Sequence, residues 1–197
     1  MLFPRTIFFL ALLALARTNP AERKKAAICE FFHHVQAFQD DQWEDSVILM
    51  KRLLGEMITA LLPYPEYAEY KESMQAYLDR GKSIVKSSSV QEKMAYFQGF
   101  NEGGDKPMLT GSPAKKKELT RPLNNFQTNM IFNVLTEFHK KLIKAADDME
   151  RVVRLSDNSS MGELFRLLDQ YRKEGLGSLT ENIASRILAL KEQYECV

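Results

Sequence analysis

Histidines and a group of carboxylates are the residues of this chain whose chemistry suits a metal ion. His33 and His34 are adjacent, and neighbouring side chains of a helix point about 100° apart, so the two rings cannot share one ion. No ligand residue stands four positions after either of them, and His139 is alone in the sequence. The acidic residues that cluster at an expected helix start are Asp40, Asp41, Glu44 and Asp45. They lack the glycine and the alternating oxygen ligands of a calcium loop, so we predict no metal ion and no cofactor.

The motifs of the common enzyme classes are missing from the sequence. The chain contains no G-x-S-x-G, no H-E-x-x-H, no phosphate-binding P-loop and no Cys–His pair with a plausible nucleophile elbow. We therefore predict that the protein is not an enzyme.

Basic residues form one dense group in the second half of the chain. Lys115, Lys116 and Lys117 are consecutive, and Arg121 follows them within the segment 99–121, which is rich in Gly, Pro, Lys and Thr and shows no period. We expect this segment to be a long surface loop, because such a stretch has no face to bury. On a loop these cations would suit heparan sulfate, phosphate or an acidic receptor surface, or they would form a solvated linker that proteases can cleave.

Tyrosines recur along one face of the helix expected after residue 65. Tyr67, Tyr70 and Tyr77 share this face. A tyrosine has an apolar ring and a polar tip, so it suits either the rim of a helical bundle or a binding surface. The three residues are candidates for contact with a partner, and the alternative is that their rings pack at the rim.

The first sixteen residues predict the destination of the protein. Arg5 precedes an uncharged apolar run that ends at Ala14-Leu15-Ala16, the small-x-small pattern that signal peptidase accepts. The run is too short to cross a bilayer as a helix. We predict a signal peptide over residues 1–16 and a secreted mature domain over 17–197.

A secreted chain can form a disulfide and carry an N-linked sugar, and three residues are candidates for these modifications. In an oxidising compartment the chain's two cysteines, Cys29 and Cys196, are expected to form an intramolecular disulfide, with free thiols or an intermolecular link as the alternatives. Asn158-Ser159-Ser160 matches the acceptor pattern for N-glycosylation, so Asn158 is a candidate site.

Composition excludes several kinds of partner. Without the signal peptide the chain has 26 Lys and Arg against 26 Asp and Glu, so no overall field attracts nucleic acid or an anionic membrane. No second apolar run reaches spanning length, because Lys51, Arg52 and Glu56 interrupt the longest one. A mature chain of about 180 residues has the size of one domain.

Apolar residues recur at helical spacing through the mature chain, and no strand-like alternation of any length occurs. Four helix starts carry a capping residue followed three positions later by Glu: Asn19 with Glu22, Ser89 with Glu92, Ser160 with Glu163, and Ser178 with Glu181. We predict an all-α fold: a single bundle of six to seven helices with one long central helix. The expected helices cover residues 20–39, 41–62, 65 to about 81, 90–98, 122–152, 161–174 and 179–195.

A signal peptide, one helical domain, two terminal cysteines and no catalytic motif together resemble the small salivary proteins that blood-feeding insects inject into their hosts, such as the mosquito type that stimulates neutrophils. The resemblance concerns the overall build. It implies a non-enzymatic, host-directed role: altering immune cells or haemostasis by binding.

The sequence thus predicts a secreted binding protein that meets a receptor or a matrix component outside the cell. Two alternatives fit the same build. One is a helical, cytokine-like receptor ligand. The other is a carrier whose soft core of Met and Phe encloses a lipid or another apolar molecule.

Overall fold

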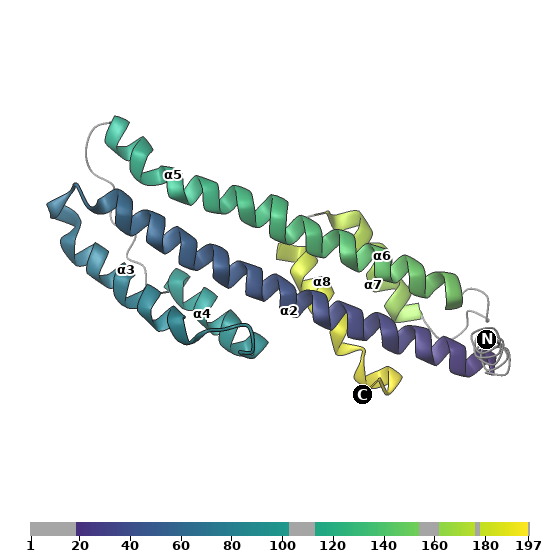
Figure 1. Ribbon diagram of the computed structural model, residues 1–197. Coiled ribbons are helices and arrows are strands. Elements are labelled where there is room, and N and C mark those ends of the chain that lie inside the picture. Colours follow the sequence, from purple (N-terminus) through teal and green to yellow (C-terminus); the bar gives the residue numbers. More distant parts are fainter. Residues whose placement is uncertain (1–18, 103–112, 154–161, 176–177, 197) are drawn as a thin grey trace, which may run out of the picture. The chain divides into compact units, whose positions relative to one another are not determined.

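The computed structural model describes residues 19–102, 113–153, 162–175 and 178–196. Throughout these ranges the chain is helical or in short turns without a strand, which confirms the all-α fold (Figure 1). The α-helices are α2 (Pro20–Leu61), α3 (Ala68–Arg80), α4 (Val90–Glu102), α5 (Pro113–Asn129), α6 (Thr136–Val153), α7 (Gly162–Glu174) and α8 (Ser178–Ala189). The predicted signal peptide and Asn158 lie outside the described residues.

Helix α2 is one element of 42 residues, where the sequence predicts two helices that meet near residue 40. The prediction of a helix start at the acidic cluster is wrong, because Asp40 and Asp41 are simply exposed residues within the helix. No Pro or Gly stands there to break the hydrogen-bond ladder. Gln42 and Ser46 continue the buried face, and the Ser46 hydroxyl donates to the Gln42 carbonyl oxygen at 2.7 Å.

The segment 99–121, which the sequence predicts as one long loop, is helical at both of its ends, and residues 103–112 between them lie outside the described residues. Helix α4 continues to Glu102, and α5 begins at Pro113. Proline suits the first turn of a helix, and the Lys, Glu and Leu residues after it have high helix propensity. Pro122, the expected start of the long helix, lies inside α5.

The long helix expected over 122–152 is present, but its hydrogen bonding changes midway. Between α5 and α6 the chain forms a π-helix, η3 (Met130–Leu135). The Thr136 hydroxyl donates to the Ile131 carbonyl oxygen at 2.7 Å where α-helical geometry resumes. A π-helical turn inside a regular helix leaves no signature in apolar spacing.

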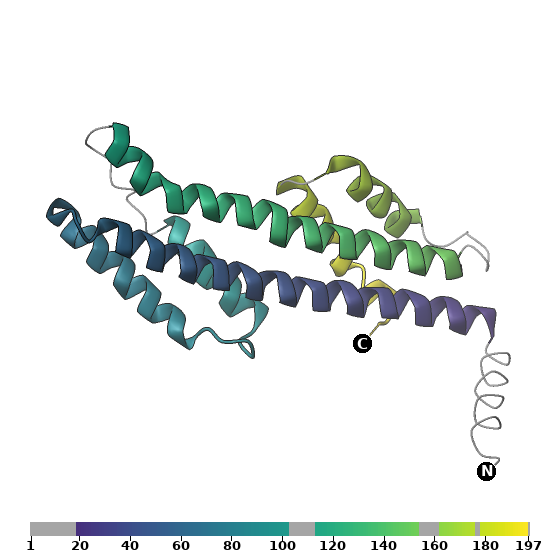
Figure 2. The same ribbon diagram turned by 45° about the horizontal axis from the view of Figure 1, so that its top comes forward.

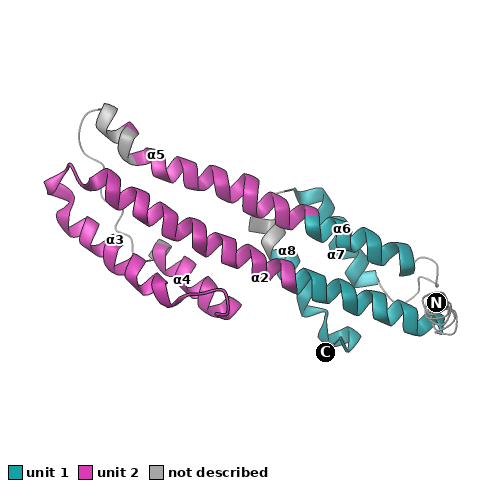
Figure 3. Cartoon of the chain, viewed as in Figure 1, with its two compact units in different colours: residues 1–36, 141–197 teal, residues 37–140 magenta. Residues whose placement is uncertain are grey.

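The chain divides into two compact units (Figure 3). Unit 1 comprises residues 1–36 and 141–197. Its core is formed by apolar side chains from α2, α6, α7 and α8, and its most deeply buried large residues are Phe31, Phe32, Leu142, Leu164, Leu167, Leu168 and Tyr171. The short 3-10 helix η4 (Glu192–Tyr194) leads to Cys196, which a disulfide joins to Cys29 of α2.

Unit 2 comprises residues 37–140. Helix α3 lies beside the second part of α2 in both views (Figures 1 and 2). Two short 3-10 helices flank α3: η1 (Pro65–Tyr67) before it and η2 (Gly81–Ser83) after it. The core of the unit unites α2, α3 and α4, and it contains Val47, Met50, Leu53, Leu54, Met57, Leu61, Tyr67, Met74, Tyr77 and Tyr96.

Candidate functional site

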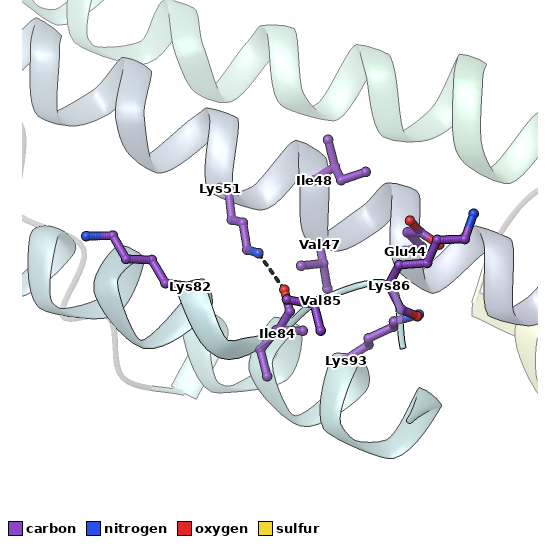
Figure 4. Close-up of a pocket in the computed structure, with 9 residues that line it drawn as sticks. All are labelled: Glu44, Val47, Ile48, Lys51, Lys82, Ile84, Val85, Lys86 and Lys93. Carbon is purple, nitrogen blue, oxygen red and sulfur yellow. Dashed lines mark hydrogen bonds between the residues drawn. The ribbon is translucent and has the colours of Figure 1, made fainter. Parts of the chain in front are cut away.

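A pocket of about 280 Å³ opens in unit 2 between α2, the connection from η2 to α4, and the first turn of α4 (Figure 4). Four lysines and one glutamate line it together with four aliphatic side chains. The lining residues are Glu44, Val47, Ile48, Lys51, Lys82, Ile84, Val85, Lys86 and Lys93. We call this site the lysine pocket.

Two of the lysines hold the backbone that forms one side of the pocket. Lys51 reaches from α2 and donates to the Ile84 carbonyl oxygen at 2.7 Å, as the dashed line in Figure 4 shows. Lys93 on α4 donates to the Lys86 carbonyl oxygen at 3.0 Å. The connection between η2 and α4 is therefore fixed by ammonium groups on both of its sides.

The start of α4 is fixed by the capping box that the sequence predicts. The Ser89 amide donates to a Glu92 carboxylate oxygen at 2.8 Å, and the Glu92 amide donates to the Ser89 hydroxyl at 3.2 Å. These two bonds satisfy amides that the helix itself leaves without partners. They set the position at which Lys93 leaves the first turn of α4.

The charges of the lysine pocket are unbalanced. Lys93 is only 4% exposed, and neither Lys93 nor Lys51 forms an ion pair with a carboxylate of the described residues. Lys82 pairs with Asp79 at 2.7 Å at the surface, which leaves Glu44 as the acid of the lining. Burial lowers the pKa of the Lys51 ammonium group. Removing cations from water without a counter-charge is costly, so the site favours the arrival of an anion.

The structure places the predicted tyrosine face largely in the core. Tyr67 and Tyr77 are 7% and 9% exposed, and Tyr70 is half-buried. The Tyr77 ring stacks on Tyr96 with centroids 4.9 Å apart, and its hydroxyl donates to the Tyr96 carbonyl oxygen. Tyr67 and Tyr77 therefore do not form the expected partner surface. The tyrosines do lie on a helix, but the same helical spacing serves a core face and a binding face.

The predicted basic group lies on a helix instead of a loop. Residues 115–117 and Arg121 belong to α5, where Lys117 and Arg121 are exposed and, four positions apart, share one face. The side chains of Lys115 and Lys116 lie outside the described part of the structure. Neither Lys117 nor Arg121 lines the lysine pocket.

One feature of the sequence points toward the lysine pocket, although none of the sequence-based predictions includes this site. Lys51 interrupts the apolar run of α2, and Lys93 stands among the inward-facing Val90, Met94 and Phe97 of α4. A lysine within an apolar stripe indicates a buried or half-buried cation. Its partner, a carbonyl oxygen of a distant turn, follows only from the folded chain.

The two cysteines meet as predicted. A disulfide joins Cys29 and Cys196, whose Cα atoms lie 5.0 Å apart across 167 positions of sequence. Beside it, Lys25 and Glu195 form an exposed ion pair at 2.7 Å.

His33 and His34 are exposed on α2, and within the described ranges no group of three His, Cys, Asp or Glu is placed to hold a metal ion.

Comparison of the chain with protein-family models, with curated proteins and with solved structures found no match. Among the helices that the structure describes, none is long and apolar enough to span a bilayer.

Proposed function

We propose that this chain is a secreted, non-enzymatic binding protein that acts outside the cell and modulates host immune cells or haemostasis. The observation that carries the proposal is the disulfide between Cys29 and Cys196. Structural disulfides persist in oxidising compartments and are rare in the cytosol. The apolar run and cleavage pattern of residues 1–16 support the same destination. The host-directed role rests on the resemblance to salivary effector proteins.

Two cationic regions of unit 2 support binding to an acidic extracellular partner. One is the pair Lys117 and Arg121 on the exposed face of α5, and the other is the lysine pocket. The mature chain carries no net charge, so attraction to such a partner must come from local groups of this kind. A receptor ectodomain or a sulfated matrix chain has the matching charge.

The carrier alternative predicts a cavity lined by Phe and Met. The lysine pocket contains neither residue type, so it is not that cavity. The cytokine-like alternative stays a prediction.

Binding of the labelled mature protein to isolated neutrophils, together with the clotting time of plasma, tests the proposal. We expect saturable binding to the cells or a dose-dependent change in clotting. The double charge reversal Lys117→Glu with Arg121→Glu should weaken the response. The matched reversal Lys140→Glu with Lys144→Glu on α6, also exposed and four positions apart, should not. Hydrolytic turnover by the purified protein, or no response in either system, would contradict the proposal.

A further inference from the structure

We propose that the lysine pocket binds a small amphipathic anion, with the anionic head on Lys51 and Lys93 and a short apolar tail against Ile48 and Val85. This inference adds a ligand to unit 2 and does not depend on the host-directed role proposed above. The ligand class follows from the charge, the lining and the size of the pocket.

The charge argument concerns the two lysines that hold the connection. Each ammonium group has three N–H donors, and each spends one on a backbone carbonyl oxygen, at Ile84 or at Lys86. The remaining donors of Lys93 belong to a side chain that is almost fully removed from solvent and has no carboxylate partner among the described residues. An anionic head supplies the missing acceptors and the missing charge at once.

Lys82 and Lys86 add a weaker, outer contribution. Their side chains extend to opposite sides of the pocket (Figure 4). Both are exposed, and Lys86 attracts an anion over a distance without being desolvated itself, whereas the ion pair with Asp79 offsets the charge of Lys82. Glu44, which lies on α2 near Lys86, carries the opposite charge and would repel an anion. The anionic head is therefore not expected beside Glu44.

The apolar argument concerns the mouth of the pocket. Ile48 and Val85 line it and are 55% and 53% exposed, although most large aliphatic residues of this unit are buried or half-buried. Val47 and Ile84 continue the apolar surface inward. A purely inorganic anion would leave these side chains in water, whereas a ligand with a hydrocarbon portion covers them and removes their apolar surface from water.

Size limits the ligand. The pocket of about 280 Å³ lies just below the range of about 300–1,000 Å³ that drug-sized ligands occupy. It is much larger than the ~30 Å³ that one water molecule takes in the liquid. A single head with a short chain matches this space better than a folded macromolecular segment does.

Isothermal titration of the mature protein with octyl phosphate, below its micelle concentration, tests the inference. We expect saturable binding at one site, and methyl NMR signals of Ile48 and Val85 should shift with the same saturation curve. Inorganic phosphate lacks the apolar tail, and octanol lacks the anionic head. Each should bind at least tenfold more weakly than octyl phosphate. Octyl sulfate distinguishes the source of the head: binding equal to that of octyl phosphate indicates any tetrahedral oxyanion, and weaker binding indicates a phosphate.

Variants separate the two parts of the site. Lys93→Met keeps the length and apolar stem of the side chain and should weaken octyl phosphate binding about tenfold or more, because a charge-assisted contact is lost. Ile48→Ser should weaken it roughly threefold to fivefold, since part of the tail contact disappears. Leu62→Ser is the matched control, as Leu62 is an exposed aliphatic residue just after the end of α2 and outside the lining; it should leave the affinity unchanged.

Thermal melting of each variant shows whether unit 2 still folds. If Lys93→Met lowers the melting temperature enough to unfold the unit, Lys86→Gln replaces it, because Lys86 is exposed and holds the connection through its backbone carbonyl oxygen, which the substitution keeps. We expect Lys86→Gln to weaken binding about twofold to threefold and to reduce its salt dependence. No binding of octyl phosphate, equal binding of octanol, or binding of an acidic peptide in its place would overturn the inference.

Discussion

The two units of this protein are stabilised by different means. Unit 1 is closed by the Cys29–Cys196 disulfide, and its buried charge is matched: Arg172 of α7 contacts Glu150 at 2.8 Å and Asp147 at 2.7 Å on α6. Unit 2 contains no cysteine, and its buried Lys93 and half-buried Lys51 are satisfied only by backbone carbonyl oxygens of the described residues.

The difference separates a structural role from a binding role. A half-buried cation with three carboxylate partners, as Arg172 has in Asp147, Glu150 and Asp169, has no need of a further ligand, so this cluster serves stability. A buried cation without a carboxylate retains unused donors and unbalanced charge, which is how ligand sites are commonly built. Substitutions in each unit test this contrast, beginning with the largest expected effect.

Loss of the disulfide should be the most damaging change in the molecule. For the double substitution Cys29→Ser with Cys196→Ser, the loop-entropy model gives a loss of as much as about 5 kcal/mol. Hydrogen exchange should locate the loss in unit 1, with faster exchange of the amides of α7 and α8 and little change in α3. Equal acceleration in both units would contradict the assignment of the disulfide to unit 1 alone.

Removal of the Arg172 guanidinium should be the next largest effect. In Arg172→Met the Glu150 side chain, 9% exposed, loses its contact with the guanidinium but remains buried, at a cost of about 2–4 kcal/mol. Chemical denaturation measures the change. Arg166→Met is the control: Arg166 and Glu163 form an exposed pair, and the variant should melt like the wild type. Similar losses in both variants would show that burial of Glu150 is not the cause.

Two glycines of unit 2 should respond to alanine in opposite directions. A Cβ atom at Gly81 would lie 2.6 Å from Cζ of the Tyr96 ring, so Gly81→Ala should destabilise the unit by about 1–3 kcal/mol. Gly55 lies within α2 with no atom within 4 Å of the added carbon, so Gly55→Ala should stabilise by about 0.5–1 kcal/mol. Thermal melts of the two variants measure these changes in stability. An unchanged melting temperature for Gly81→Ala would show that the Tyr96 ring moves freely.

The Tyr96 hydroxyl should make unit 2 sensitive to alkali. This oxygen is buried without a hydrogen-bond partner among the described residues, and burial, with a smaller contribution from Tyr77, raises its pKa to about 12. The unfolded chain ionises this group near pH 10, so stability is complete below pH 10 and falls as the pH rises towards 12. Tyr96→Phe should remove this part of the pH dependence and cost little at pH 7. The melting temperatures of the wild type and of Tyr96→Phe, measured from pH 8 to 12, test this prediction. If both melting temperatures fall equally steeply with pH, the Tyr96 hydroxyl is not the cause.

Much of the fold could be predicted because it depends on local signals. The apolar period indicates helices wherever it persists, and Asn19 caps α2 as expected, its side-chain oxygen accepting from the Ala21 amide at 3.1 Å. Ser89 and Glu92 cap α4. The disulfide followed from parity and compartment, because two cysteines in a secreted chain allow one internal pairing.

The remainder depends on contacts between distant residues. Asp40 and Asp41 suit a helix start, yet α2 passes through them because its buried face continues at Gln42. The burial of Tyr77 depends on Tyr96, nineteen positions away. The lysine pocket arises when α2 meets a turn thirty-three residues further along the chain. Neither spacing nor composition encodes such pairs.

The intact mass of the protein released into the medium by cells that express the full chain tests the central claim most directly. An extracellular protein closed by the Cys29–Cys196 disulfide should have the mass of a chain that begins after Ala16, less two hydrogen atoms, once any sugar has been removed enzymatically. A chain that stays in the cells with its first sixteen residues attached, or one whose two thiols react with iodoacetamide without prior reduction, would contradict the account.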